Sequence, residues 1–393
     1  MPHALPTPDL NAALLAETAR LAERTIEVRR HLHANPELGF QEHATAALVA
    51  DRCAALGFEV RRGVGGTGVL ADLDSGRPGP TVLVRADMDA LPIEEVADGR
   101  PYRSTVPGVM HACGHDGHTA IALSVAQVLH ALRDRWNGRV RMCFQPAEEL
   151  GDGARRMIQD GALTGVDRAV GLHLTELYPV GVLGLGPGPL LAALETFRIT
   201  ITGTGGHGSA PDGAIDPLPI TAEVILALRD LRARIGDSAT VTATQVNGGT
   251  APNIIPTEVS IAGTIRSLDP EGCGALSEQV AQIVREIAER GGASAGLTFG
   301  PSCPTLTNDP AVTELLRTAF TEAFGPERVQ PVEPMTGSDD MSRFLREVPG
   351  CYYAVGAPSP DAPSSHHPAF DIDETALSVG VESLTRATLA LLA

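Results

Sequence analysis

Four short apolar runs constrain the fold of this chain more than any other feature of its sequence. Stretches with helical spacing separate them, such as residues 119–132. Short apolar runs in this arrangement are typical of buried strands in a largely parallel sheet that is covered by helices. The pattern therefore predicts an α/β fold. The four runs are Thr81–Val84, Val140–Phe144, Ala169–Leu174 and Cys351–Val355.

Two helices are expected ahead of the first run. Apolar or small residues recur with 4-3-4-3-4 spacing from Leu14 to Leu32, which places them on one helical face. Asn35-Pro36 would end that helix, and a second helix is expected over residues 42–56. The repeating positions are Leu14, Thr18, Leu21, Thr25, Val28 and Leu32.

The middle of the chain follows a different pattern. Apolar and polar residues alternate over 196–201 and 259–265, which is typical of antiparallel strands with one buried face. Helical stretches over 217–234 and 276–290 lie between and after these strands. Strands and helices of this kind predict a separate α+β domain.

Two segments rich in glycine and proline indicate where that domain begins and ends. They are Gly181–Pro189 and Gly300–Pro304, and such segments favour linkers and breaks between elements. We therefore expect a small α+β domain at residues 189–302, inserted into a larger α/β domain that is built from residues 1–188 and 303–393.

The composition excludes several classes of partner. Lys and Arg number 30 against 48 Asp and Glu, which gives a formal net charge of −18. That sign is opposite to the basic surplus of nucleic-acid-binding proteins and to what anionic lipid attracts. The six cysteines are scattered without a CxxC pair, and the N-terminus lacks the pattern of a secretory signal. We therefore expect a soluble, cytoplasmic protein that binds neither nucleic acid nor membrane.

The densest group of polar residues lies at residues 111–118, where three His, one Cys and one Asp occur. Cys113 and His115 are two residues apart, so in an extended segment both side chains point the same way and suit one metal ion. Two alternatives stay open here. One is a glycine-rich loop with incidental histidines, and the other is a thiol hydrolase with Cys113 as nucleophile and a His as its base.

Two adjacent carboxylates, Glu148 and Glu149, follow the apolar run 140–144. Open α/β sheets place their ligand sites at the carboxyl ends of the strands. Neighbouring side chains diverge, so one carboxylate can bind a metal ion while the other faces a bound water. Metal-assisted hydrolysis needs this division between a ligand and a base.

Further histidines extend the set of donors. His173 lies near the end of the run 169–174, and His367 lies with His366 in a loop near the C-terminus. We expect zinc or manganese, with nickel or cobalt as further candidates, because borderline nitrogen, oxygen and sulfur donors accept all four. The donors suffice for two adjacent divalent ions, and they are Cys113, His115, Glu149, His173 and His367.

The inserted domain has polar features of its own. A glycine-rich segment around His207 follows a strand but lacks a phosphate-loop motif. Asn253 lies in a turn, and Arg266 ends an alternating strand. An Arg beside an Asn suits a substrate carboxylate, because guanidinium binds carboxylate through two parallel hydrogen bonds.

Taken together, these motifs resemble those of metal-dependent amidohydrolases of the aminoacylase/carboxypeptidase clan. Within the clan, the chain is similar to the subgroup of hippurate hydrolase, N-acyl-amino-acid amidohydrolases and auxin-conjugate hydrolases. The similar segments occur in order through most of the chain: RRHLHANPELGFQE, VLVRADMDALPI, MHACGHDGH, FQPAEE, GLHL, GGHGSAPD, GGTAPNIIP, GTIRS, GSDDM and HHPAFDIDE.

The resemblance implies a zinc-peptidase-like catalytic domain with a lid domain that forms a homodimer. It implies a dinuclear centre held by the five donors above, with Cys113 as a ligand and Asp89 as the carboxylate that orients a ligand. Glu148 would be the general base. His207 would come from a partner subunit's lid to support the oxyanion, and Asn253 and Arg266 would bind the substrate carboxylate.

The implied reaction is hydrolysis of the amide bond of N-acyl-L-amino acids. A metallo-carboxypeptidase or dipeptidase of the same fold is the nearest alternative, and a Cys113-dependent thiol hydrolase is another. A non-catalytic binding protein would be expected to lack Glu148 or a ligand, and this chain retains them all. One segment differs from the subgroup, since the chain has GSDDM at 337–341 where GSEDF is expected, which would alter the acyl pocket.

Overall fold

The computed structural model describes residues 8–97, 99–360 and 362–393, and the chain divides into two compact units. The first unit extends to Gly188 and also contains Thr307–Glu333 and Asp339–Ala393. The second, which we call the lid unit, contains Pro189–Leu306 and Pro334–Ser338. The sequence placed the two boundaries at 188/189 and 302/303, so the chain leaves the lid unit later than expected and returns to it once.

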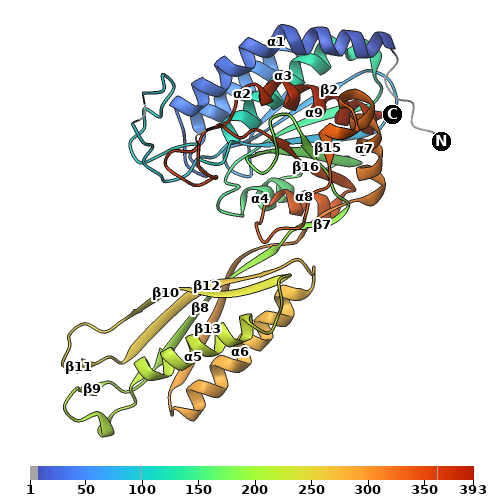
Figure 1. The fold of residues 1–393 in the computed structure, drawn as a ribbon. Coiled ribbons are helices and arrows are strands. Elements are labelled where there is room, and N and C mark those ends of the chain that lie inside the picture. Colours follow the sequence, from blue (N-terminus) through green and yellow to red (C-terminus); the bar gives the residue numbers. More distant parts are fainter. Residues whose placement is uncertain (1–7, 98, 361) are drawn as a thin grey trace. The chain divides into compact units, whose positions relative to one another are not determined.

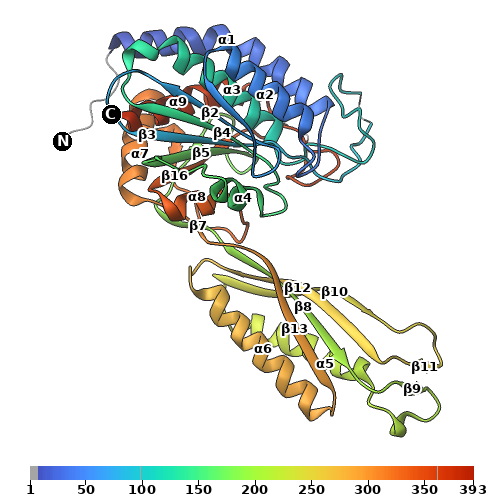
Figure 2. The same cartoon turned by 180° about the vertical axis from the view of Figure 1, so that it is seen from behind.

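An eight-stranded sheet forms the centre of the first unit (Figures 1 and 2). Its four middle strands, β4-β3-β5-β16, are parallel to one another and contain the four apolar runs, which confirms the predicted α/β sheet. These four strands are mostly buried because helices cover the sheet. In sheet order the eight strands are β1 (Glu59–Val64), β2 (Gly68–Asp74), β4 (Arg139–Gln145), β3 (Thr81–Asp87), β5 (Arg168–Thr175), β16 (Gly350–Gly356), β6 (Leu183–Gly184) and β15 (Val329–Gln330).

Helices cover both faces of this sheet (Figure 2). One face carries α1 (Pro8–Ala34), α2 (His43–Ala55), α3 (His115–Ala131) and α9 (Ala376–Leu392). The other carries α4 (Gly153–Gln159) and α8 (Met341–Glu347), and α7 (Pro310–Phe324) lies beside β15 and β16. Short 3-10 turns occur at Arg133–Arg135, Pro211–Gly213 and Pro326–Arg328.

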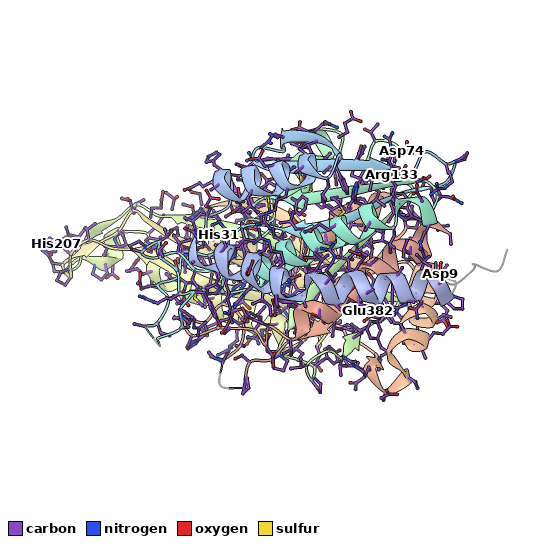
Figure 3. The ribbon with its side chains drawn as sticks, turned by 90° about the horizontal axis from the view of Figure 1, so that it is seen from above. Asp9, His31, Asp74, Arg133, His207 and Glu382 are labelled. Carbon is purple, nitrogen blue, oxygen red and sulfur yellow. The ribbon has the colours of Figure 1, made fainter. Side chains whose placement is uncertain are left out.

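The first helix has the register that its sequence predicts. All six repeating positions between Leu14 and Leu32 are buried. Asp9 and His31, which lie near the two ends of α1 in Figure 3, are exposed. Of the two threonines on the buried face, Thr25 has a polar contact, since its hydroxyl lies 2.7 Å from the Ser124 hydroxyl of α3, whereas the Thr18 hydroxyl has no hydrogen-bond partner among the described residues. No helix in the described part of the chain is long and apolar enough to cross a membrane.

The lid unit is an antiparallel sheet with α5 (Pro217–Arg232) and α6 (Gly272–Arg290) packed on one face (Figure 1). The alternating residues Phe197, Ile199 and Ile201 are buried under these helices, as expected. In sheet order the strands are β10 (Ala239–Gly248), β12 (Glu258–Ser267), β8 (Ala193–Thr202) and β13 (Ser294–Cys303). Two small pairs are β9 (Gly206–His207) with β11 (Ile254–Ile255), and β7 (Gly188–Leu191) with β14 (Leu306–Asn308).

The break expected at Gly300–Pro304 is instead the continuation of a strand. β13 runs through Gly300 and Pro301, with a register shift between Phe299 and Ser302. Proline is tolerated there because β13 is an edge strand with a bulge, so the missing N–H removes no ladder hydrogen bond on the open side.

Candidate metal centre

The polar residues singled out in the first unit gather at the carboxyl ends of its parallel strands. Asp87 ends β3, Glu148 and Glu149 follow β4, and His173 lies near the end of β5. Cys113 lies just ahead of α3, which begins at His115. The site therefore occupies the edge at which open α/β sheets bind ligands.

Donor atoms in this region form overlapping groups. Cys113, His115 and His173 have ligand atoms within 4.8 Å of one another, and Cys113 Sγ lies 3.7 Å from His173 Nε2. Cys113 also belongs to a group with Glu149 and His366, while His115 belongs to one with Glu148 and Glu149. Because the groups share members, the arrangement would suit two adjacent ions, and Cys113 belongs to two of the groups.

Two of the histidines have a ring tautomer that a backbone carbonyl fixes. His115 Nδ1 donates to the carbonyl oxygen of Asp89 at 2.9 Å, and His173 Nδ1 donates to the carbonyl oxygen of Leu174 at 2.6 Å. A backbone acceptor at Nδ1 fixes the tautomer whose Nε2 carries the lone pair. His115 Nε2 is buried and has no hydrogen-bond partner among the described residues. This unmatched nitrogen is what a metal ligand requires, so the donor set fits divalent ions.

Asp89, two residues after the end of β3, contacts both His115 and Glu149. Its Oδ2 accepts a hydrogen bond from the backbone N–H of Glu149 at 3.0 Å. Its Oδ1 lies 3.4 Å from His115 Nδ1. One buried residue therefore contacts two of the expected ligands at once, His115 through its carbonyl oxygen and Glu149 through its carboxylate, which is the usual role of the groups that surround a metal centre.

Glu148 lies among negative charges. Burial, followed by the neighbouring carboxylates of Asp339, Glu149 and Asp340, raises the pKa of Glu148 well above its ordinary value. A raised pKa gives this carboxylate the proton affinity that a general base needs near neutral pH. The same crowding of carboxylates favours the binding of cations, because a cation offsets their mutual repulsion.

The C-terminal loop differs from the sequence expectation at one residue. The sequence named His367 as a ligand, but the structure brings His366 to the cluster, with Nε2 3.1 Å from Glu149 Oε1. His367 is exposed, and its Nδ1 accepts the backbone N–H of Ala369 at 3.1 Å. His366 has a left-handed backbone, with φ of 66°, and its N–H donates to the Ala112 carbonyl. These two features turn His366, and not its neighbour, toward the site.

Sequence reasoning missed a buried cation beside the site. Arg85 donates to Asp87 at 2.6 Å, to Asp339 at 3.1 Å and to Asp340 at 3.2 Å. Asp87 in turn accepts a 2.6 Å hydrogen bond from His118 Nδ1. The signal was present in the sequence, since a charged residue inside an apolar strand run must find a buried partner.

The segment GSDDM at 337–341, which differs from the subgroup, contacts Arg85 through Asp339 and Asp340. Asp339 accepts from Arg85 and from the Tyr352 hydroxyl, and Asp340 accepts the N–H of Ala154 at 2.9 Å. Met341 is fully buried. These contacts give Asp339 and Asp340 a structural role. That the segment also shapes an acyl pocket stays a prediction.

The three site residues expected in the inserted domain all belong to the lid unit. His207 lies at the tip of this unit, in β9 (Figure 3). Asn253 is beside it, because β9 pairs with β11 and the Asn253 carbonyl accepts the N–H of Gly208. Arg266 lies near the end of β12 and donates to the Thr336 carbonyl at 2.8 Å.

The expected adjacency of Arg266 and Asn253 is wrong. Glu258 pairs with Thr202 at one end of β12, and Arg266 pairs with Leu194 at the other. Strands advance about 3.3 Å per residue, so these ends are roughly 25 Å apart. Figure 1 shows β9 and β11 at one end of the lid sheet, and Asn253 lies there, away from Arg266. Asn253 lies in the turn before β12, and Arg266 lies near the far end of that strand. The sequence alone does not show how far a strand separates the residues at its two ends from a shared site.

Comparison with known proteins agrees with this geometry. The family model described as "Peptidase family M20/M25/M40" matches residues 83–390. Thermostable carboxypeptidase 2 of Saccharolobus solfataricus is 38% identical, over 98% of both chains. N-acetyl-L-cysteine deacetylase of Bacillus subtilis is 38% identical, over 91% of this chain and 85% of its own length.

A solved structure is similar over nearly the whole chain. It is that of the Bacillus subtilis YXEP protein, described as a dinuclear metal-binding peptidase, with a TM-score of 0.84 and 33% identity. The similarity covers 95% of this chain and 99% of that protein. The fold therefore has a counterpart in a protein that is described as binding a dinuclear metal centre.

Proposed function

The chain belongs to peptidase family M20/M25/M40 and is a hydrolase of that family, and we propose that it cleaves the amide bond of N-acyl-L-amino acids. One observation carries the proposal. Glu149 shares donor groups with Cys113 and with His115, and burial raises the pKa of the adjacent Glu148 well above its ordinary value. A ligand and a base on one turn are the two parts that metal-assisted amide hydrolysis needs.

We propose that the first unit holds two divalent ions through five residues: Cys113, His115, Glu149, His173 and His366. Ions bound there would supply Lewis-acid activation of water and of the scissile carbonyl. A carboxylate oxygen of Glu148 would take the proton from the attacking water and then donate it to the departing amine nitrogen. Asp89 would keep His115 and Glu149 oriented throughout, because it contacts both.

His207 is suited to support the developing oxyanion. The backbone N–H of Ser209 donates to His207 Nδ1 at 3.1 Å, so Nδ1 accepts and the ring proton lies on Nε2. That N–H is a donor of the kind that stabilises an oxyanion. Arg266 is our candidate for binding the carboxylate of the substrate through its guanidinium.

His207 and Arg266 lie at opposite ends of one lid unit, and this separation supports a homodimer. A single small substrate cannot contact both ends of a sheet that are about 25 Å apart. We therefore propose that His207 and Asn253 of one chain contact a different substrate molecule from Arg266 of that chain, with His207 and Asn253 serving the site of a partner subunit.

A thiol hydrolase is less well supported. Burial raises the pKa of the Cys113 thiol, so the free thiol would be a poor nucleophile at neutral pH. Bound metal instead favours the thiolate, because a coordinated thiol is deprotonated. The ligand role therefore uses Cys113 in a form that the site can maintain.

The test is a substrate panel on enzyme that has been stripped of metal and then reloaded. N-acetyl, N-benzoyl, long-chain acyl and indole-acetyl amino acids would be assayed with zinc, manganese, nickel and cobalt in turn, next to dipeptides. We expect the stripped enzyme to be inactive and the reloaded enzyme to prefer N-acyl amino acids. Preference for dipeptides would favour a peptidase, and full activity after chelation would favour the thiol mechanism.

A further inference from the structure

A buried carboxylate outside the donor set contacts the turn that carries Glu148 and Glu149. Glu42 is 0% exposed. Its Oε1 accepts the backbone N–H of Ala147 at 2.8 Å, and its Oε2 accepts the hydroxyl of Thr67. Glu42 ends the segment RRHLHANPELGFQE, to which the proposed mechanism assigns no role.

The residue that Glu42 contacts has a strained backbone. Ala147 has φ of 52°, in the left-handed region that residues with a Cβ atom seldom adopt. Such a conformation persists only where surrounding contacts enforce it. Gly39, from the same segment as Glu42, lies close to this residue, since a Cβ atom on Gly39 would lie 3.1 Å from the Cβ of Ala147.

The position of Ala147 gives that strain a consequence. It directly precedes Glu148 and Glu149, which must point to different tasks although they are consecutive. β4 ends at Gln145 and the left-handed Ala147 follows two residues later at the start of the turn, while the Asp89 carboxylate accepts the N–H of Glu149. Contacts from two directions therefore fix the turn, one from Asp89 and one from Glu42.

We propose that Glu42 is a positioning residue that holds Ala147 in its left-handed conformation and so keeps Glu148 and Glu149 in separate orientations. Its effect on catalysis rests on the proposed function, whereas its effect on metal binding does not. Glu42 touches neither substrate nor metal in this proposal, and it acts through the backbone of Ala147.

The first test compares two variants of similar shape. Glu42→Gln keeps an acceptor for the Ala147 N–H and a polar partner for Thr67, so we expect kcat within about threefold of wild type. Glu42→Met fills the same volume without an acceptor. We expect it to lower kcat by roughly 10- to 100-fold with little change in KM, because small displacements of a catalytic group have effects of that size.

A rescue separates positioning from general damage. Glycine adopts positive φ without strain, so Ala147→Gly should leave the wild-type enzyme nearly unchanged but restore much of the kcat lost in Glu42→Met. Glu37 provides a matched control, since its carboxylate accepts the N–H groups of Ala44 and Thr45 at the start of α2. Glu37→Met should leave kcat within about twofold of wild type, because it does not contact the turn.

Metal affinity gives a readout that needs no substrate. In chelator competition, Glu42→Met should bind zinc about 10- to 100-fold more weakly, as expected when a residue that orients a ligand is lost, and adding Ala147→Gly should reverse this. Equal effects of Glu42→Met and Glu37→Met, or no rescue by Ala147→Gly, would overturn the proposal. If no N-acyl amino acid is cleaved by the wild type, the proposed function fails, and the metal measurement still decides the role of Glu42.

Discussion

Nε2 of His366 lies 3.1 Å from Oε1 of Glu149, and these atoms come from segments that are far apart in the sequence. The contact joins the C-terminal loop to the turn after β4. Cys113 belongs to the same group of donors. Both histidines are exposed, but His367 Nδ1 accepts the N–H of Ala369 in its own loop whereas His366 contacts Glu149, so the two adjacent side chains have different partners.

The first prediction follows from that difference. His366→Ala should weaken metal binding by tenfold or more, because it removes a ligand. His367→Ala should leave the affinity unchanged. Chelator competition followed by metal analysis of both variants measures the two effects. A loss that occurs only in His367→Ala would return the assignment to His367.

The second prediction concerns the base. Glu148→Gln should lower kcat by about a hundredfold or more, because general-base catalysis is lost, while the metal content stays at the wild-type level. Glu149→Gln should instead lower the metal content, since that carboxylate is an expected ligand. Near-normal turnover of Glu148→Gln in fully loaded enzyme would refute the role of Glu148.

The third prediction tests whether subunits share sites. His207→Ala and Glu148→Gln should each be nearly inactive as homodimers. Mixing the two chains by refolding or co-expression should restore about a quarter of the wild-type activity, because half of the dimers are mixed and each holds one complete site. Mixtures with no more activity than the parent variants would place His207 in the site of its own chain or outside the reaction.

The fourth prediction concerns recognition of the substrate carboxylate. Arg266→Ala should raise KM for an N-acyl amino acid by about tenfold or more, since a charge-assisted hydrogen bond is lost. With a net charge of −18, the protein as a whole repels an anionic substrate. A cation near the site is therefore needed to attract the substrate carboxylate. The same substrate as its C-terminal amide should show a much smaller rise. Equal effects on acid and amide would exclude this role.

The fifth prediction is a pH dependence of stability. Burial alone would raise the pKa of Asp371, but Arg29 at 2.7 Å and Arg100 outweigh it and hold that pKa below its ordinary value of 3.8. A lowered folded-state pKa stabilises the protein above the unfolded value, and this contribution is lost as pH falls through the folded value. Asp371→Asn should therefore lower the free energy of unfolding by about 1–3 kcal/mol at pH 7.

That difference should shrink as the pH falls below 3.8, because Asp371 is then protonated first in the unfolded wild type and, at lower pH, in the folded protein as well. Urea unfolding at a series of pH values measures it. Asp51 offers a matched control, since its ion pair with Arg62 is exposed, and Asp51→Asn should change stability little at any pH. A difference for Asp371→Asn that is independent of pH would show that charge is not the cause.

Much of the fold could be predicted from local patterns. The apolar runs marked the parallel strands, and the alternating runs marked the antiparallel lid sheet, because period and length report how many faces of a strand are buried. The limit appears at Pro301, where a break was expected. Whether a proline ends a strand or lies at a bulge on an edge depends on which strands pair, and no short stretch of sequence contains that information.

By itself the sequence determined the chemistry available to this protein: thiol, imidazole and carboxylate donors at strand ends, and a pair of glutamates on one turn. The tertiary structure decided which atoms meet. It brought His366 and not His367 to the donor cluster, separated Arg266 from Asn253, and placed the Glu42 carboxylate at the backbone N–H of Ala147. Side-chain direction depends on backbone dihedrals and on the packing of distant segments, so residues that are equivalent in the sequence become different only when the chain folds.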